Sequence, residues 1–391
     1  MRIVHIKEYF YPQLGYQETF LAREQAKLGH DVYVVTSDRY GAFLYKSNQQ
    51  LLGSRIMGAG LVVEEGIKTC RLSTLFEIPH CIWLRDLGKK VQELEPEIVI
   101  VHDIPNLSTI RIALMKKRGA SFKLIYDVHS TFGNSTSKMR VIYPLYRQTF
   151  SRLIRQTADG LVAIGEPSRT FMHHKHGIPL DQIHVIPLGA DHERFQFDPT
   201  ARHEVRTKLS IHENDIVFIY TGKIVPKKKL SVLIQALGRL ASANNDVKLI
   251  LVGSGPQDYV SRLKDEANSL KLGDKLVWHD TVPNEELPRY YSAADVAVWP
   301  AWASISMLEA MSCGLPIIVS DSRNINEMTF VTSALTYSGY DPSNLAEQMQ
   351  RLLDPIFRQR LGQEGRRIID EKLNWKVIAK QFVDIAEGGM L

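Results

Sequence analysis

Residues 296–320 read VAVWPAWASISMLEAMSCGLPIIVS, and this stretch decides the fold. Apolar runs at 296–299 and 317–319 enclose a short loop and a segment that begins a helix near Ser304. Short apolar runs bounded by Pro and Gly are typical of buried strands. The stretch therefore predicts a strand–helix–strand unit, the repeating piece of a parallel sheet.

The same alternation of apolar runs and helical segments extends outward to both ends of the chain. Towards the N-terminus we expect strands at 3–6, 32–35, 98–101, 124–126, 161–164 and 184–186, with a helix at 19–28. After PLGAD at 187–191 the pattern restarts, with further strands at 216–220, 248–252 and 276–278 and a helix at 230–240. Two consecutive α/β halves predict two Rossmann-like domains that face a central cleft, where the carboxyl ends of their strands bind ligands.

The length of the chain agrees with two domains. A chain of 391 residues exceeds the usual size of one domain, and its 44% hydrophobic and 23% charged residues are ordinary for a folded protein. We place the domains at 1–192 and 193–374, and we expect 375–391 to form a helix that returns to the first domain. No short-period repeat is present, which excludes a solenoid.

Composition also bounds the compartment and the partners. No stretch approaches the ~20 uncharged apolar residues that span a bilayer, and the N-terminus lacks a signal-peptide core, so we expect a cytoplasmic protein. Cys70, Cys81 and Cys313 have no paired spacing and predict reduced thiols. The net charge of +5 and the pI of 8.9 favour a phosphate-bearing or anionic ligand. Nucleic acid is not expected, because aromatic residues do not alternate with the basic ones.

The helix that begins near Ser304 has the features of a diphosphate site. Ser304 or Ser306 can cap it, and the exposed backbone N–H groups at a helix start, with the positive end of the helix dipole, attract phosphate. Glu309 would lie about one turn further in, where a carboxylate can accept two hydrogen bonds from the vicinal diol of a ribose. For an isolated glutamate the alternative is a solvent-facing position on the helix.

The run EAMSCGLP at 309–316 resembles the donor-binding signature of glycosyltransferase family 4, retaining enzymes of the GT-B architecture. In that family the run Glu-Ala-Met-Ala-x-Gly-x-Pro binds the nucleotide ribose. The resemblance implies a retaining, metal-independent hexosyltransferase whose donor, a UDP- or GDP-sugar, is a substrate, so no cofactor is expected. It also implies donor contacts from the start of the helix, at Ser304, Ile305, Ser306, Met307 and Glu309.

A second segment, TGKIVPKKK at 221–229, looks like the family's Gly-Arg-x-x-x-x-Lys-Gly loop. Lys223 fills the Arg position, Lys228 the Lys position, and Lys229 stands where glycine is usual. Two cations at one strand end can neutralise a pyrophosphate and stabilise the charge of a departing nucleoside diphosphate. Lys223 and Lys228 are therefore catalytic candidates.

Glycines at strand ends are further candidates for donor contacts. Gly222 belongs to the lysine loop, and Gly253 begins a turn that resembles the family's Gly-x-Gly-Pro. In the first half, residues 12–16 resemble the family's Pro-x-x-Gly-Gly loop, with Tyr16 in place of the second glycine. Gly15 and Tyr16 are expected to approach the donor sugar or its phosphate, although a plain turn is the alternative.

His129 ends a predicted strand, at the place where the family has a histidine that contacts the transferred sugar. An imidazole there can donate a hydrogen bond to a sugar hydroxyl, and a structural histidine is the alternative. His102 and Asp103 end the preceding strand and rank below His129. Three further histidines lack metal-ligand spacing, and we expect them on a helix surface: His173, His174 and His176.

One departure from the family falls eight positions before Glu309. Ala301 stands there in place of the family's first glutamate, and 302–304 replace a Gly-Phe-Gly. Two interpretations follow. Backbone N–H groups at 303–307 hold the phosphates of an active enzyme, or the chain is a non-catalytic GT-B subunit that binds nucleotide sugar or stabilises a partner. With no carboxylate nucleophile to name, front-side displacement by the acceptor hydroxyl fits retention better than a covalent intermediate.

The first domain is expected to hold the acceptor, a glycan or lipid-linked molecule of cell-surface polysaccharide or glycolipid synthesis. Its segment KMRVIYPLYRQTFSRLIR, from Lys138 to Arg155, is basic and apolar at helical spacing. It predicts either a helix on the anionic inner face of a membrane or a core-packing helix with a solvated basic face, and Pro144 interrupts it. A peripheral membrane location is thus one possibility.

Overall fold

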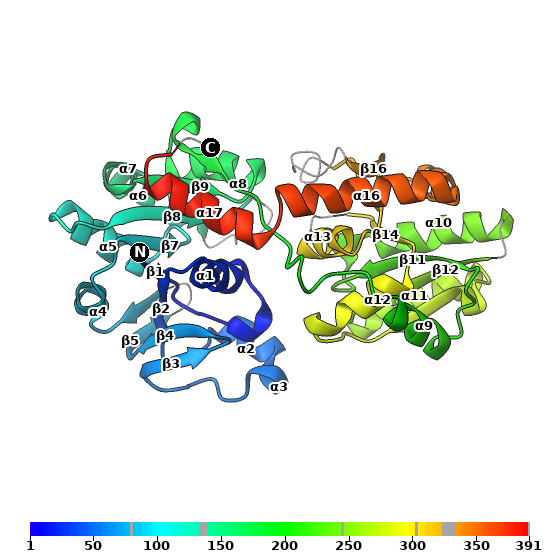
Figure 1. Cartoon of the computed structure of the whole chain (residues 1–391), viewed down its shortest axis with the longest axis horizontal. Helices are drawn as coiled ribbons and strands as arrows, with labels where there is room; N and C mark the ends of the chain where they lie inside the picture. Colours follow the sequence, from blue (N-terminus) through cyan, green and yellow to red (C-terminus); the bar gives the residue numbers. More distant parts are fainter. Residues whose placement is uncertain (79–80, 133–138, 244–245, 302–303, 323–332, 390–391) are drawn as a thin grey trace. The chain divides into compact units, whose positions relative to one another are not determined.

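The computed structural model describes residues 1–78, 81–132, 139–243, 246–301, 304–322 and 333–389 (Figure 1). The chain divides into two compact units. Unit 1 consists of Met1–Leu188 together with Trp375–Leu391, and unit 2 consists of Gly189–Asn374. Each unit has its own sheet.

Unit 1 contains an eight-stranded sheet in the order β10-β9-β8-β7-β1-β2-β4-β3. Its strands are β1 Arg2–Ile6, β2 Asp31–Ser37, β3 Gly60–Glu64, β4 Ile67–Leu72, β7 Ile98–His102, β8 Lys123–Val128, β9 Gly160–Ala163 and β10 His184–Val185. All neighbours pair in parallel except β3, which is antiparallel to β4. A separate hairpin is formed by β5 Thr74–Ile78 and β6 Cys81–Leu84.

Helices pack on the sheet of unit 1 and on one another. They are α1 Gln17–Lys27, α4 Leu87–Leu94, α5 Leu107–Lys117, α6 Met139–Thr149, α7 Ser151–Thr157, α8 Glu166–Phe171 and α17 Trp375–Ala386, with short α2 Ala42–Ser47 and α3 Gln49–Leu52 at one side. The C-terminal α17 packs on α1. There the ring of Trp375 stacks on Phe20, with centroids 5.3 Å apart and planes 7° from parallel. The last helix is therefore part of the core of unit 1.

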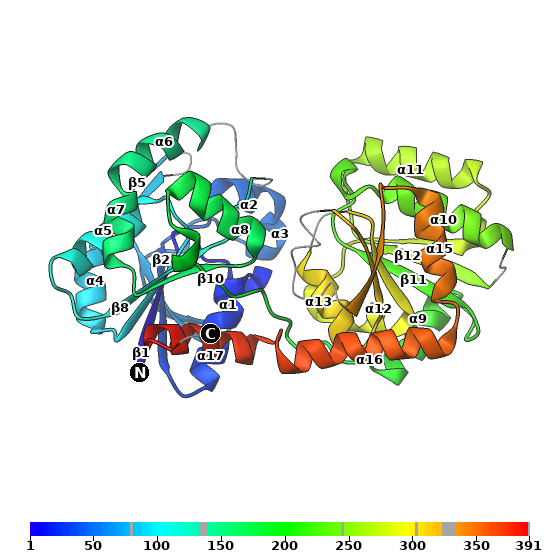
Figure 2. The same cartoon turned by 90° about the horizontal axis from the view of Figure 1, so that it is seen from above.

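Unit 2 has six parallel strands in the order β13-β12-β11-β14-β15-β16. They are β11 Ile216–Thr221, β12 Val247–Val252, β13 Leu276–His279, β14 Val296–Trp299, β15 Ile317–Ser320 and β16 Ala334–Tyr337. Helices lie on both faces of this sheet (Figure 2). They are α9 Pro199–Lys208, α10 Leu230–Ala243, α11 Gln257–Ser269, α12 Leu287–Ala293, α13 Ile305–Ser312, α15 Pro342–Arg351 and α16 Pro355–Glu371.

In both sheets the order in which strands are added reverses next to the first strand, and this reversal positions the candidate sites. In unit 2 the chain runs from β11 outward through β12 and β13, then returns to the other side of β11 with β14. In unit 1, β7 returns to the other side of β1 in the same way. Doubly wound sheets bind ligands beyond the carboxyl ends of the strands at such a reversal. Candidate ligand-binding residues are therefore those that follow β11 and β14 in unit 2 and β1 and β7 in unit 1.

No helix within the described ranges is both long and apolar enough to cross a bilayer.

Candidate functional site

In unit 2 a buried tyrosine ties the end of β11 to the start of α13. The indole Nε1 of Trp299 donates to the backbone oxygen of Thr221 at 3.1 Å. The hydroxyls of Thr221 and Tyr291 lie 2.7 Å apart, and the Tyr291 hydroxyl donates to the backbone oxygen of Ser306 at 3.3 Å. The strand end and the helix start are therefore held as one piece.

Glu309 lies inside this piece and is only 4% exposed. Its Oε1 accepts a hydrogen bond of 2.9 Å from Nδ2 of Asn284, which precedes α12. Burial raises the pKa of Glu309 to about 7; the hydrogen bond from Asn284 opposes this rise, Asp191 adds to it and Arg194 opposes it. The alternative of a solvent-facing glutamate on the helix is therefore wrong. Burial disfavours the charge of this carboxyl group, and hydrogen bonds donated by a ligand would stabilise that charge.

The start of α13 offers backbone donors. Ser304 is the N-cap residue in extended conformation, and in the described part of the chain no side chain caps this helix. The Ser304 hydroxyl instead meets the Ser306 hydroxyl at 3.0 Å. The N–H of Met307 already donates to the backbone oxygen of Ser304 at 3.1 Å, whereas those of Ile305 and Ser306 have no backbone acceptor among the described residues. Trp302 and Ala303 lie outside the described residues.

Four lysines lie in the loop after β11. Lys228 is partly buried, and its pKa is lowered to about 8 by burial and by the charges of Lys227 and Lys223. Lys223 is exposed. Lys229 adopts the left-handed conformation with φ of 57°, which explains why glycine is usual at that position of the motif. Because the lysines repel one another, an anion bound here would relieve an existing electrostatic cost.

The loops after β11 and β12 pack backbone against backbone. The N–H of Ile224 donates to the oxygen of Ser254 at 2.8 Å, and the N–H of Gly253 donates to the oxygen of His279 at 3.0 Å. A Cβ atom on Gly253 would lie 1.9 Å from the oxygen of Gly222. Gly253 is thus required for the close approach of the two loops, and its effect on the lysine loop is indirect.

In unit 1 the reversal beside β1 gathers histidines and carboxylates. His129 follows β8, and its Nε2 donates to Oδ2 of Asp127 at 2.9 Å. Nδ1 of His102, at the end of β7, donates to the same oxygen at 2.8 Å. His102, Asp127 and His129 bring ligand atoms within 4.8 Å of one another. The two hydrogen bonds to Oδ2 of Asp127 account for the short distances among these three side chains.

An ion pair lies next to this set. Nζ of Lys7, just after β1, is 3.0 Å from Oδ2 of Asp103. Oδ1 of Asp103 accepts from the backbone N–H of His129 at 3.3 Å. Burial raises the pKa of the neighbouring Glu8 to about 7, although the hydroxyl of Ser108 donates to its carboxylate at 3.1 Å. Polar groups from three adjacent strands thus meet at one edge of the sheet.

Gly15 and Tyr16 lie in the loop between β1 and α1. Gly15 has φ of 63° and ψ of 43°, a left-handed conformation that glycine adopts without strain. Tyr16 is the residue before α1, is 39% exposed and meets Tyr11 edge to face. Both belong to the same unit as His129.

Two expectations about unit 1 need correction. His176 is not on a surface: it is 1% exposed, burial lowers its pKa to about 4, and its neighbours are aromatic rings, Tyr143, Tyr146 and Phe171. The segment expected at 138–155 is not one helix, because α6 ends at Thr149 and α7 begins at Ser151. Lys138 lies outside the described residues.

Tyr143 and Tyr146 of α6 and Ile154 of α7 are buried, whereas Leu145 of α6 is exposed. Tyr146 and Ile154 belong to the core of unit 1, whereas Arg147, Arg152 and Arg155 are exposed. The two helices therefore pack on the core through one side, and the exposed side carries Leu145 together with the arginines.

Comparison with known proteins gives two family matches in tandem. The family described as Glycosyltransferase Family 4 matches residues 19–194, and Glycosyl transferases group 1 matches residues 201–368. Among curated proteins, the GDP-mannose-dependent alpha-(1-6)-phosphatidylinositol monomannoside mannosyltransferase of Mycobacterium tuberculosis is 27% identical over 77% of this chain and 80% of its own length. The protein of the same name from Mycolicibacterium smegmatis is 27% identical over 62% of this chain and 65% of its own length.

Solved structures agree on the fold. HepE of Anabaena in complex with UDP aligns with a TM-score of 0.74 and 19% identity, over 99% of this chain and 100% of that one. A glycosyltransferase from Rickettsia africae aligns with a TM-score of 0.75 and 14% identity, over 99% of this chain and 98% of that one. At such identities the likeness concerns the fold alone.

Proposed function

Because the chain belongs to glycosyltransferase family 4, with the two Rossmann-like units of a GT-B protein, we propose that it is an active retaining hexosyltransferase. Its donor is a UDP- or GDP-sugar, used as a substrate without a metal ion or cofactor. The observation that carries the proposal is buried Glu309 beside the start of α13, which no side chain caps in the described part of the chain and which Tyr291 bonds to the end of β11.

Each part of that piece suits one part of a nucleoside diphosphate. The Glu309 carboxylate accepts hydrogen bonds from the ribose diol, while Asn284 donates a further hydrogen bond to its Oε1 and fixes its orientation. The N–H groups of Ile305 and Ser306 and the positive end of the α13 dipole take the diphosphate. Lys223 and Lys228 then stabilise the negative charge that grows on the diphosphate as the sugar leaves.

Front-side displacement suits the region where the transferred sugar is expected. Ala301, at the position of the family's first glutamate, is fully buried and has no group that can attack the sugar. The bond from the acceptor hydroxyl to the anomeric carbon forms on the face from which the diphosphate departs, and the departing phosphate oxygen takes the hydroxyl proton. Retention then follows without a covalent intermediate.

For the acceptor we propose a glycan or lipid-linked molecule of cell-surface polysaccharide or glycolipid synthesis, held by unit 1. His129 would contact the transferred sugar, with Gly15 and Tyr16 near the donor. Two curated relatives support the acceptor class: the Mycobacterium tuberculosis protein acts on a phosphatidylinositol mannoside, and a Salmonella typhimurium relative, 21% identical, is named a lipopolysaccharide 1,2-N-acetylglucosaminetransferase. Peripheral contact with the inner face of the membrane belongs to the same proposal, through exposed Leu145 and Arg147 of α6.

A panel of UDP- and GDP-sugars tests the donor and the activity together. Calorimetry should find one nucleotide that binds, and the purified protein with that donor and a lipid-linked or glycan acceptor should release nucleoside diphosphate over many turnovers, also with EDTA present. Retention is read from the anomeric configuration of the product. Because Ala301 replaces the family's first glutamate, a non-catalytic subunit is the second candidate function. Nucleotide-sugar binding without sustained release of nucleoside diphosphate, in the presence of every acceptor, would favour it.

A further inference from the structure

A chain of hydrogen-bonded side chains runs through the interior of unit 1 and ends at His129. It begins at Gln25 in α1, whose Oε1 lies 2.7 Å from Nε2 of His5 in β1. Nδ1 of His5 lies 3.0 Å from Nε2 of His102, and the two rings stack 5.3 Å apart. Asp127 then joins His102 to His129. The first four residues are at most 1% exposed, whereas the side chain of His129 is 25% exposed.

The carboxyl group of Asp127 is the negative charge of this chain. Burial opposes that charge, but the bonds and charges of His129 and His102 outweigh burial and hold the pKa of Asp127 well below its usual range. A buried carboxylate needs a positive partner. The partner must be one of the two histidines that donate to Oδ2, or a proton shared between them.

The inner end of the chain is poorly suited to carry the positive charge. Burial lowers the pKa of His5 to about 3, so this ring is neutral. The amide nitrogen of Gln25 is buried and has no partner among the described residues. A half-turn of the amide would let it donate to His5, which could then donate to His102, and His102 to Asp127. In that arrangement both interior rings are neutral.

His129, at the outer end of the chain of hydrogen bonds, is suited to carry the positive charge. Burial opposes the charge of His129, but Asp127 and then Asp103 outweigh burial and raise the pKa of His129, while Lys7 acts against them. Those groups come from the ends of the three strands that meet here, Lys7 after β1, Asp103 after β7 and Asp127 in β8. The positive charge that matches Asp127 therefore belongs at the partly exposed ring.

We propose that Asp127 is a positioning residue, which fixes the ring of His129 through Nε2 and keeps that ring protonated beside the substrate. The consequence for turnover rests on the proposed function, whereas the effect on His129 itself does not. A protonated imidazole held in one orientation is a stronger and better aimed hydrogen-bond donor to a sugar hydroxyl or phosphate oxygen than a neutral one.

Histidine titration tests the proposal without any substrate. The 13 histidines are labelled with nitrogen-15, and the signal of His129 is assigned from its loss in His129→Gln. In the unmodified protein its pKa should lie above the ordinary value of about 6.5. In Asp127→Asn the pKa of His129 should fall by about one unit or more. A wild-type pKa at or below the ordinary value overturns the proposal even if Asp127→Asn does not fold.

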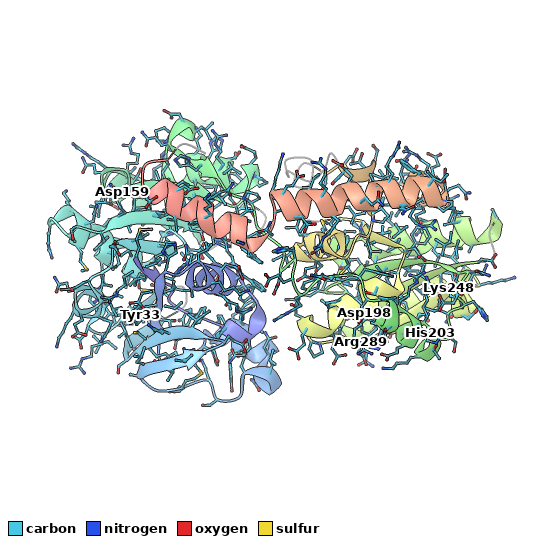
Figure 3. All side chains as sticks on the ribbon, viewed as in Figure 1. Tyr33, Asp159, Asp198, His203, Lys248 and Arg289 are labelled. Atoms are coloured by element: carbon cyan, nitrogen blue, oxygen red, sulfur yellow. The ribbon has the colours of Figure 1, made fainter. Side chains whose placement is uncertain are left out.

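Asp159→Asn is the matched control. Asp159, labelled in Figure 3, lies beyond the opposite end of β8, where its Oδ2 accepts from the N–H of Leu124 at 2.9 Å. This variant also removes a charge from unit 1, but it should leave the pKa of His129 unchanged. An equal shift in both variants would mean that the loss of one negative charge from unit 1, not the contact with Asp127, lowers the pKa of His129, and that would overturn the proposal.

Kinetics supply the functional arm. With an active donor and acceptor, Asp127→Asn should lower kcat by about tenfold with little change in KM, and the high-pH limb of the profile should move to lower pH. An unchanged profile contradicts the role in turnover. If the wild-type protein transfers no sugar at all, the proposed function fails, and the titration alone still decides whether Asp127 holds the charge on His129.

Discussion

Glu309 makes donor binding depend on pH. Its pKa is raised to about 7 by burial, so the carboxylate form falls from roughly nine-tenths at pH 8 to roughly one-tenth at pH 6. Only the carboxylate can accept both hydrogen bonds of a ribose diol. We therefore expect the affinity for the nucleoside, which lacks the phosphates proposed to contact Lys228, to weaken roughly tenfold from pH 8 to pH 6, measured by calorimetry. A flat profile would place the diol elsewhere.

Glu309→Gln distinguishes the ionisation of Glu309 from that of other groups in unit 2. The amide should weaken binding at pH 8 by about 1.5 to 3 kcal/mol and abolish the pH dependence, because it cannot ionise. Glu285→Gln is the control, since Glu285 is exposed and adjoins Asn284, the partner of Glu309. That variant should keep both the affinity and the pH dependence. Retained pH dependence in Glu309→Gln would assign it to another group.

Lys228 should matter for turnover more than for nucleoside binding. Burial and two neighbouring lysines lower its pKa to about 8, so roughly nine-tenths of it is charged at pH 7. Lys228→Ala should lower kcat by about 10²-fold, because charge on the leaving diphosphate develops in the transition state. Its effect on the binding of the nucleoside alone should be small. Lys227→Ala, an exposed neighbour, is the control, and equal loss of kcat in both would indicate only general electrostatics.

At the scale of residues, motifs found what lies close in sequence and missed what lies close only in space. Glu309 was predicted because its neighbours at 310–316 form a specific run. Asn284 was missed, since nothing in the sequence links it to a carboxyl group 25 positions later. The role of Asp127 was missed for the same reason, as its partner His102 also lies 25 positions away. The burial of His176 depends on aromatic rings from α6 and α8.

At the scale of elements, the contact between the loops after β11 and β12 can be tested through Gly253. A Cβ atom there would lie 1.9 Å from the oxygen of Gly222, and the φ of 153° is also unfavourable for other residues. Gly253→Ala should therefore destabilise unit 2 by about 3 kcal/mol or more, as backbone clashes allow little relief. Because the loop that carries Lys223 must shift, affinity for a diphosphate should fall as well. Urea unfolding and calorimetry measure the two effects.

Gly238→Ala is the matched control for that substitution. Gly238 lies in α10, and its Cβ atom would meet nothing closer than 3.4 Å, the distance to a side-chain carbon of Leu270. Alanine in a helix is favoured over glycine by roughly 0.5 to 1 kcal/mol, so unit 2 should become more stable. If both variants behaved alike, the packing of the two loops would not be the reason for glycine at 253.

Strands with a continuous apolar run were easier to predict than strands without one. The expected strands at 98–101 and 248–252 are nearly all apolar, and they became β7 and β12 in the middle parts of their sheets. The sequence prediction lacked β3, β4 and the β5–β6 hairpin. β3 is an antiparallel edge strand whose residues are mostly exposed, so it lacks the continuous apolar run of a buried parallel strand. The break between α6 and α7 at Phe150 has no glycine or proline to announce it.

At the scale of the whole molecule, the chain leaves unit 1 at Leu188 and returns to it at Trp375. Unit 1 is thus completed only by the last residues of the chain, although unit 2 is continuous. Trp375 is 2% exposed and stacks on Phe20 of α1, so it belongs to the core that α17 shares with the N-terminal helix. Truncating such a ring leaves a cavity where the two helices had close contact.

Trp375→Ala should destabilise unit 1 by about 3 to 5 kcal/mol and leave unit 2 nearly unchanged. Hydrogen exchange followed by mass spectrometry resolves the two, since amides of β7 and β8 should exchange faster while those of β11 and β12 keep their rates. Trp299→Ala, which removes a fully buried ring of β14, is the reciprocal control and should accelerate β11 and β12 alone. Equal acceleration of all four strands in either variant would show that the two units unfold as one cooperative body, because each substitution removes packing from only one of them.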